Sequence, residues 1–216
     1  MSSVFLVGAH GHIGQQIVAD LAEKGITVFA GIRDLAQADV FPDSQFVHPT
    51  AFDLNALPDK MAEQFKATRV DTIVFSAGSG GKTGDDQTLI VDLDGAVKTM
   101  EAAEQAGIKR YIMVSSIFSN HREAWDASGI KPYMIAKHYA DEMLKQTSLD
   151  YTIIRPGYLT NDAGTGEITI NPADEKGVKI PRADVAATIT ELIDAPDTIR
   201  QSYTIGSGDT PIDQAF

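Results

Sequence analysis

Short apolar runs recur along the chain, and most of them are apolar at every position rather than at every second one. Strands covered on both faces, as in parallel sheets, have this pattern, whereas half-exposed strands alternate. The sequence therefore predicts strong strands over residues 4–7, 27–32, 72–75, 111–114 and 151–154, and weaker strands over residues 45–48 and 201–205.

Between these runs, apolar residues recur at intervals of three and four, which indicates helices with one buried face. The buried faces are expected to contain Ile13, Ile17, Ala19 and Leu21 in the first helix, Leu93, Ala96, Val97, Met100 and Ala103 in a second, Ala136, Ala140, Met143 and Leu144 within residues 133–146, and the apolar positions of residues 183–193. Alternating strands and helices form βαβ units with right-handed crossovers. We therefore expect a Rossmann-type α/β fold, with a doubly wound parallel sheet in a single domain over residues 1–216.

The region that follows Arg155 is interrupted repeatedly by glycine and proline. It leaves the predicted strand 151–154 at its carboxyl end, and ligands bind at that end of the strands in doubly wound sheets. We therefore expect residues 156–182 to supply most of a short substrate lid.

A glycine-rich loop follows the first predicted strand and leads into the first helix. Its G-x-x-G-x-x-G spacing suits a tight turn, the approach of a pyrophosphate to the backbone, and close packing of helix on strand. The helix N-terminus offers free N–H groups and a partial positive charge to phosphates. A purely structural glycine-rich turn is the alternative. Dinucleotide binding predicts contacts from Gly8, His10, Gly11, His12, Ile13 and Gly14.

The end of the second predicted strand bears on the choice between NADP and NAD. An acidic side chain there binds the adenosine 2′-hydroxyl of NAD, but this strand ends without one, and Arg33 follows, which suits a 2′-phosphate. Asp34 either caps the residues after it or selects NAD. We expect NADP, with NAD as the alternative. Asp53 and Leu54 follow the third strand and are expected beside the adenine, although Asp53 also suits a cap or turn.

Residues 76–83, Ser-Ala-Gly-Ser-Gly-Gly-Lys-Thr, come close to the phosphate loop of nucleoside triphosphatases, G-x-x-x-x-G-K-[ST]. The first position is serine, and Asp85 and Asp86 follow, where their charges would repel phosphates. We therefore reject triphosphatase activity. The stretch is expected to be a flexible wall beside the dinucleotide, which Ala77 and Gly78 approach closely because they are small.

Tyr133 and Lys137 are four residues apart on a predicted helix, so their side chains point in nearly the same direction. A free tyrosine has a pKa near 10, and acid–base work near neutral pH needs a pKa about three units lower, or roughly 4 kcal/mol. An ammonium at ~4 Å supplies an interaction of about that size at an effective dielectric near 20. The pair is a candidate for proton transfer, with two ordinary surface side chains as the alternative.

Ser115 and Ser116 end the fifth predicted strand, at the same edge of the sheet as the glycine loop. The helix that carries Tyr133 lies in the next connection, so the topology brings these groups together although they are distant in sequence. We expect Tyr133, Lys137 and Ser116 to be catalytic, with Ser115 as the alternate hydroxyl.

Together these motifs resemble those of an atypical short-chain dehydrogenase/reductase of the NAD(P)-binding, NmrA/biliverdin-reductase-like group, over essentially the whole chain. The resemblance rests on the three glycines, residues 76–78 and 114–116, the Tyr133/Lys137 pair, and residues 155–157 and 180–186. It implies that Tyr133 exchanges the proton, Ser116 orients the substrate carbonyl and Lys137 holds the nicotinamide ribose. It also implies that the backbone of Arg155, Pro156 and Gly157 borders the nicotinamide.

Two departures from the group limit what the resemblance implies. Asp92 stands where extended members have the asparagine of N-x-x-G-T, which puts any inherited hydrogen-bonding role in doubt. The region after Arg155 is also smaller than the substrate region of extended epimerases, which disfavours sugar-nucleotide epimerisation.

Composition narrows the remaining possibilities. The chain has 216 residues, 43% of them hydrophobic and 22% charged, as in ordinary globular proteins, and a net charge of −12. That acidity argues against nucleic acid and membranes as partners. The sequence has no cysteine, which excludes disulfides and cysteine nucleophiles, and the histidine spacing predicts no metal site. With neither a basic leader nor a long apolar stretch in the sequence, we expect a cytoplasmic protein. We also expect it to be a monomer or a homodimer.

The candidate chemistry favours an NADPH-dependent oxidoreductase that transfers a hydride to a small carbonyl, quinone or similar small-molecule acceptor. An NADP(H)-binding redox sensor is the alternative from another class, although a sensor has no need of the Tyr133/Lys137 pair. An epimerase or dehydratase that retains a tightly held cofactor is a third possibility.

Overall fold

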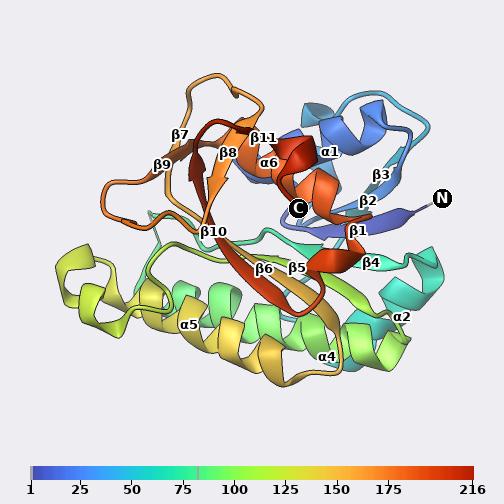
Figure 1. The fold of residues 1–216 in the computed structure, drawn as a ribbon. Helices are drawn as coiled ribbons and strands as arrows, with labels where there is room; N and C mark the ends of the chain where they lie inside the picture. The colour runs from blue at the N-terminus through green and yellow to red at the C-terminus, as the bar shows by residue number, and fades with distance from the viewer. Residues whose placement is uncertain (1, 82) are drawn as a thin grey trace.

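A mostly parallel β-sheet forms the centre of the computed structural model, which describes residues 2–81 and 83–216 (Figure 1). Within the described residues, one sheet has the order β11-β8-β10-β6-β5-β4-β1-β2-β3. Its parallel strands are β1 (Ser3–Val7), β2 (Thr27–Ile32), β3 (Val47–Ala51), β4 (Thr72–Phe75), β5 (Arg110–Val114), β6 (Asp150–Pro156) and β10 (Gln201–Ser207). The reversal of strand order at β1 is that of a doubly wound, nucleotide-binding sheet, so the predicted fold class is confirmed.

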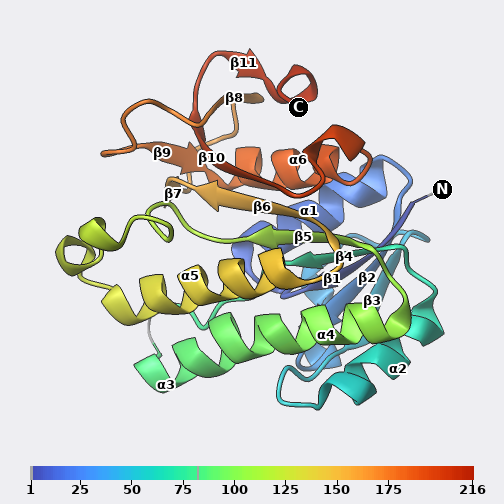
Figure 2. The same cartoon turned by 60° about the horizontal axis from the view of Figure 1, so that its bottom comes forward.

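Helices cover both faces of the sheet (Figures 1 and 2). Helices α1 (His12–Glu23) and α6 (Arg182–Leu192) lie on one face, and α2 (Pro58–Thr68), α4 (Ala96–Ala106) and α5 (Lys131–Gln146) lie on the other, with the single-turn α3 (Asp85–Gln87). Within β4, Val74 faces the α1/α6 core, whereas Ile73 and Phe75 face the core under α2, α4 and α5. Burial on both faces is the reason these strands are apolar at every position.

The weaker sequence signals misplaced several boundaries. The third strand begins at Val47 rather than residue 45, and α5 begins at Lys131 rather than residue 133. Helix α2 and the short strands β7 (Tyr158–Thr160), β8 (Glu167–Ile170), β9 (Lys179–Pro181) and β11 (Thr210–Pro211) were not predicted. Their apolar residues are too few to produce a clear periodicity, and pairing with strands distant in sequence stabilises the short ones.

Two residues expected on buried helix faces are exposed. Ala19 of α1 faces solvent, and Met143 of α5 is 43% exposed. The buried face of α5 includes the charged residues Lys137 and Asp141, which an apolar periodicity does not count. Helix α5 is therefore rotated relative to the orientation that its apolar residues alone predict, and this rotation brings Lys137 into the interior.

The segment expected to act as a lid, residues 156–182, leaves β6 at its carboxyl end and is folded for much of its length. Strand β7 pairs with β9, and β8 pairs antiparallel with β10 and β11 at the edge of the sheet. The Asp184 carboxylate of α6 accepts hydrogen bonds from the backbone N–H groups of Thr165 and Gly166, at 3.0 and 2.9 Å. These contacts hold the segment against the domain.

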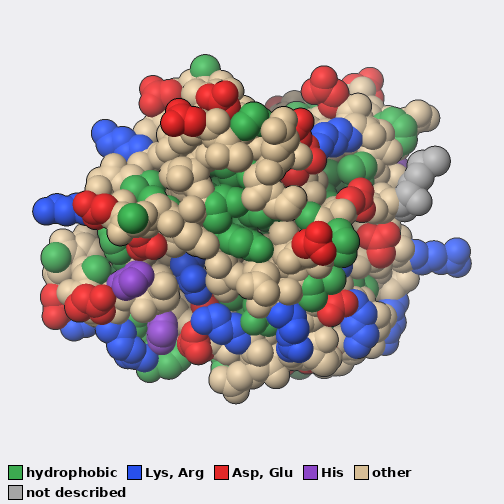
Figure 3. Space-filling view, viewed as in Figure 1, with side chains coloured by type: hydrophobic (Ala, Val, Ile, Leu, Met, Phe, Trp, Pro, Cys, Tyr) green, Lys and Arg blue, Asp and Glu red, His purple; other side chains and the backbone are tan. Residues whose placement is uncertain are grey.

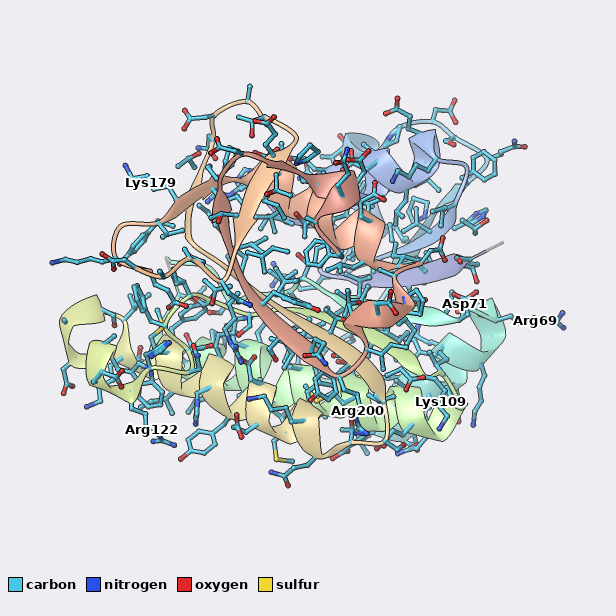
Figure 4. The ribbon with its side chains drawn as sticks, in the orientation of Figure 1. Arg69, Asp71, Lys109, Arg122, Lys179 and Arg200 are labelled. Atoms are coloured by element: carbon cyan, nitrogen blue, oxygen red, sulfur yellow. The ribbon has the colours of Figure 1, made fainter. Side chains whose placement is uncertain are left out.

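Charge is distributed unevenly over the surface. On the face shown in Figure 3, Lys and Arg side chains gather along the lower edge, over α4 and α5, and Asp and Glu are spread elsewhere. Arg122, Arg200 and Lys109 lie along this edge (Figure 4). In the part of the chain that the structure describes, every helix is too short or too polar to cross a lipid bilayer.

Candidate functional site

A pocket of about 340 Å³ opens at the carboxyl ends of β1, β2 and β4. This volume lies within the range of about 300–1,000 Å³ typical of small-molecule sites. Its lining includes eight residues that the sequence predicted to bind the cofactor: Gly8, His10, Gly11, Arg33, Asp53, Leu54, Ala77 and Gly78. The other predicted contacts, His12, Ile13, Gly14, Lys137, Pro156 and Gly157, lie outside this lining.

The pocket also contains residues that the sequence interpretation missed. Gln37, Asn55, Gln87, Ile90 and Val91 come from segments beyond the predicted motifs, whereas Ser79 and Thr83 lie in a predicted stretch but were not named individually. Gln37 follows Arg33 by four residues, and Ser79 and Thr83 belong to the stretch expected as a wall of the site, so their positions carried a weak signal. Lys82, part of the rejected phosphate-loop match, lies outside the described residues.

The glycine loop is shaped by two close backbone approaches. Gly8 has a φ of +88°, and a Cβ built on it would lie 2.6 Å from the Cα of Ala77. A Cβ on Gly14 would lie 2.4 Å from the carbonyl oxygen of Gly8, so only glycine allows α1 to begin this close to β1. Gly11 precedes α1, and no side chain caps the first turn of the helix. The first N–H groups of α1 are thus open to an anion, which suits a dinucleotide pyrophosphate.

Asp34, which follows β2, was expected either to cap the next helix or to select NAD, and the structure shows the cap. Its carboxylate accepts a hydrogen bond from the backbone N–H of Ala36, at 2.9 Å, and caps the 3₁₀ helix Leu35–Val40. Arg33 is exposed and lines the pocket. Asp53 has the turn role considered for it, because it accepts hydrogen bonds from the backbone and side-chain amides of Asn55, at 2.8 and 3.1 Å. It also lines the pocket, and its contact with an adenine stays a prediction.

Tyr133 and Lys137 lie together on α5, beside the end of β5. The Lys137 ammonium is 5.7 Å from the centroid of the Tyr133 ring, and it donates a hydrogen bond to the carbonyl oxygen of Val114 at 3.2 Å. Only 4% of the Lys137 side chain is exposed. The alternative of an ordinary surface pair therefore does not describe this lysine.

Asp92 is the charged partner of Lys137. It is fully buried, and its Oδ1 lies 3.3 Å from the Lys137 ammonium. Its Oδ2 accepts a hydrogen bond from the backbone N–H of Ser79, at 3.0 Å, which connects the ion pair to the wall of the pocket. Asp92 belongs to a π-helix, Thr88–Gly95, an unusual element that is frequent at functional sites. Residues 92 and 137 are far apart in sequence, so no local pattern could have paired them.

The protonation behaviour of Tyr133 differs from the sequence-based expectation. Burial raises the pKa of the phenol, and the charge of Asp92 raises it further. Lys137 and the hydroxyl of Ser116 act in the opposite direction but do not outweigh these effects. Burial alone would lower the pKa of Lys137, yet Tyr133 and the carboxylates of Asp92 and Asp141 raise it, so the lysine is charged. Lys137 lowers the pKa of Tyr133, as its position on the helix predicts, but burial and Asp92 outweigh it, so the lysine alone does not bring this pKa down toward neutrality.

The two serines after β5 have different surroundings. The Ser115 hydroxyl is buried and lies 3.4 Å from that of Ser119, which donates a hydrogen bond to the Asp141 carboxylate at 3.1 Å. Arg155 of β6 donates to the same carboxylate, at 2.9 Å. Ser115 therefore belongs to an internal polar network, whereas the Ser116 hydroxyl is only partly buried, donates a hydrogen bond to the carbonyl oxygen of Ile117 at 3.3 Å and lowers the pKa of the Tyr133 phenol.

Pro156 ends β6, and Gly157 follows it. A Cβ on Gly157 would lie 2.5 Å from the carbonyl oxygen of Val178. Glycine is therefore required at this position because the segment before β9 packs closely against its backbone. Its backbone still lies at the carboxyl edge of the sheet, as the resemblance implied for the border of the nicotinamide.

Comparisons with known proteins agree with this geometry. The NAD(P)H-binding family matches residues 8–196. The uncharacterized sugar epimerase YhfK of Bacillus subtilis is 42% identical over 213 residues, covering 99% of this chain and 98% of that protein. The solved oxidoreductase ylbE from Lactococcus lactis has a TM-score of 0.89 at 40% identity, covering 99% of this chain and 94% of that one. ChuY, an anaerobillin reductase from Escherichia coli O157:H7, has a TM-score of 0.73 at 25% identity, covering 96% and 98%.

These comparisons confirm the resemblance that the motifs indicated. The family match also supports a nicotinamide cofactor for this protein. The matched region begins at Gly8, the first glycine of the loop, and extends past α6. The chain belongs to the NAD(P)H-binding family of Rossmann-fold proteins.

Proposed function

We propose that this protein is an NADPH-dependent oxidoreductase that reduces a small carbonyl, quinone or similar acceptor. The observation that carries the proposal is the placement of Tyr133, Lys137 and Ser116 together at the carboxyl end of β5, connected to the dinucleotide pocket through Asp92 and Ser79. Reductase and oxidoreductase relatives support the same class of reaction.

Each of the three side chains has a part in this reaction. A reduced nicotinamide, when bound, supplies a hydride to the acceptor carbon. Tyr133 gives its phenolic proton to the acceptor oxygen, and Ser116 donates a hydrogen bond that orients that oxygen. Lys137 contributes a fixed positive charge and a free donor toward the ribose. The tyrosinate then regains a proton from solvent, which completes the cycle.

The proposal is tested by incubating the protein with NADPH and a panel of aldehydes, ketones and quinones, and following the loss of NADPH absorbance. We expect saturable turnover of at least one acceptor. Tight cofactor binding without turnover of any acceptor would contradict the enzyme proposal and favour a redox sensor.

An epimerase is the second candidate, because the relative with 42% identity carries the name of a sugar epimerase. Such an enzyme returns the hydride to its substrate, so it consumes no net cofactor. Turnover of a sugar without any change in nicotinamide absorbance, with cofactor retained through gel filtration, would establish this candidate in place of the reductase.

Replacing Arg33 by alanine tests the choice of NADP. Arg33 is the exposed cation on the pocket after β2, and a hydrogen bond to a charged group contributes about 1.5–3 kcal/mol. We expect the Kd for NADPH to rise by roughly 10- to 100-fold and that for NADH to stay unchanged, measured by fluorescence titration.

Lys109→Ala is the matched control, since Lys109 precedes β5 at the opposite end of the strands (Figure 4). It should leave both dissociation constants unchanged. An equal loss of affinity for the two cofactors in Arg33→Ala would remove Arg33 as the selector of the 2′-phosphate.

A further inference from the structure

The buried pair of Asp92 and Lys137 has a consequence for the proton chemistry of the site. Both side chains are almost completely withdrawn from solvent, with exposed fractions of 0% and 4%. A buried lysine alone would be a strong positive centre beside Tyr133. The carboxylate 3.3 Å away makes the pair neutral overall.

The hydrogen bonds of the pair fix the direction of the ammonium. Lys137 has three N–H donors, of which one is used by the carbonyl of Val114 and another faces Asp92. Asp92 is itself held from its other oxygen by the backbone N–H of Ser79. The lysine is thus anchored between β5 and the π-helix, and it has one donor left for other partners.

Charge cancellation is large enough to matter at Tyr133. A unit charge about 5 Å from an ionisable group interacts with the charged form of that group by about 3 kcal/mol at an effective dielectric of 20. This energy corresponds to a pKa shift of about two units. The charged groups that act on the phenol are Lys137 and Asp141 from its own helix and Asp92 from the π-helix, together with the Ser116 hydroxyl from the end of β5. Among these, Asp92 opposes Lys137 most directly because it contacts the ammonium.

We propose that Asp92 is a positioning residue that offsets the charge of Lys137 and so, together with burial, holds Tyr133 as a protonated phenol, the form that donates a proton during reduction. The proposal rests on the proposed reductase function for its chemical meaning. In the reductive direction the phenol O–H bond breaks and its proton goes to the acceptor oxygen. In the reverse direction, oxidation of an alcohol, the side chain must start as a tyrosinate to accept that proton.

Asp92→Asn tests the proposal, because it removes the negative charge while keeping the size of the side chain. The ionisation of Tyr133 is read from the tyrosinate absorbance during a pH titration, as the difference between each protein and the same protein carrying Tyr133→Phe. We expect the midpoint in Asp92→Asn to fall by about one to two pH units relative to the natural chain. An unchanged midpoint would overturn the proposal.

Asp94→Asn is the matched control, from the same π-helix. The Asp94 side chain is 61% exposed and pairs with Lys98, at 2.9 Å. Its replacement should leave the Tyr133 midpoint in place. A fall equal to that in Asp92→Asn would overturn the specific role of Asp92, because it would show a general response to lost negative charge.

A double variant, Asp92→Asn with Lys137→Met, covers the case in which Asp92→Asn alone does not fold, since it leaves no uncompensated buried charge. If Asp92 cancels Lys137, removing both should return the midpoint to that of the natural chain. A midpoint more than about one pH unit higher would show that Lys137 acts uncancelled, and would overturn the proposal. The titration needs no acceptor, so failure to find a substrate contradicts only the proposed function.

Discussion

Replacing Tyr133 by phenylalanine is expected to lower kcat for acceptor reduction by about 10²- to 10⁴-fold, the usual contribution of a positioned proton donor. The phenol is the proposed proton source and lies beside Lys137, and phenylalanine keeps the ring while removing that proton. The Kd for NADPH should change little, because Tyr133 lies outside the lining of the dinucleotide pocket. Steady-state kinetics on the best acceptor and a separate cofactor titration measure the two effects.

Tyr139→Phe is the matched control on the same helix. Tyr139 is 45% exposed, and its hydroxyl accepts a hydrogen bond from Arg122 rather than facing the site. Its replacement should leave kcat unchanged. Full activity in Tyr133→Phe would remove this residue from the mechanism, although the cofactor assignment would still stand.

Asp141→Ala is expected to destabilise the fold by about 3–5 kcal/mol, because it leaves the Arg155 guanidinium buried without its carboxylate. The pair is 2.9 Å apart, and its side chains are 1% and 6% exposed. It also connects α5 to β6 and anchors Ser119, which lies behind the catalytic candidates. Urea unfolding, followed by circular dichroism, measures the loss.

An exposed ion pair provides the comparison. Asp126 pairs with Lys131 at 2.6 Å, but its side chain is 83% exposed, so Asp126→Ala should cost less than about 1 kcal/mol. Replacing both members of the buried pair by apolar residues, Arg155→Met with Asp141→Leu, should recover most of the stability lost in Asp141→Ala. A loss in Asp141→Ala as small as that in Asp126→Ala would show that water reaches Arg155.

The central strands and the glycine loop could be predicted because their signals are local. A strand such as β4 is apolar throughout since both of its faces are covered, and the three glycines of the loop are recognised by their spacing within a few residues, although the approach that requires Gly8 is to the distant Ala77. Helix α2 escaped prediction because only Met61, Ala62 and Phe65 are buried along its length. Strands β8 and β11 are stabilised by antiparallel pairing at the sheet edge, which no short window of sequence reveals.

The candidate site divides in the same way. Tyr133 and Lys137 could be found from their spacing on one helix, and Ser116 from its place after a strand. The resemblance drew attention to Asp92, but its pairing with Lys137 could not be predicted, because its contacts with Lys137 and Ser79 join three separate segments of the chain. Asp92 also contributes to reversing the expected direction of the tyrosine pKa, an error that followed from considering the lysine without its partner and without burial.

The order of apolar and polar residues was enough to establish a doubly wound sheet and to predict a dinucleotide loop and an acid–base pair, since periodicity and spacing act over distances of one or two helical turns. The tertiary structure alone decided the electrostatic character of that pair. Burial and the charge of Asp92 depend on how α5, the π-helix and β5 pack together. Charges that lie together inside a protein act through a poorly screened medium, so the protonation of Tyr133 depends on spatial neighbours rather than on neighbours in sequence.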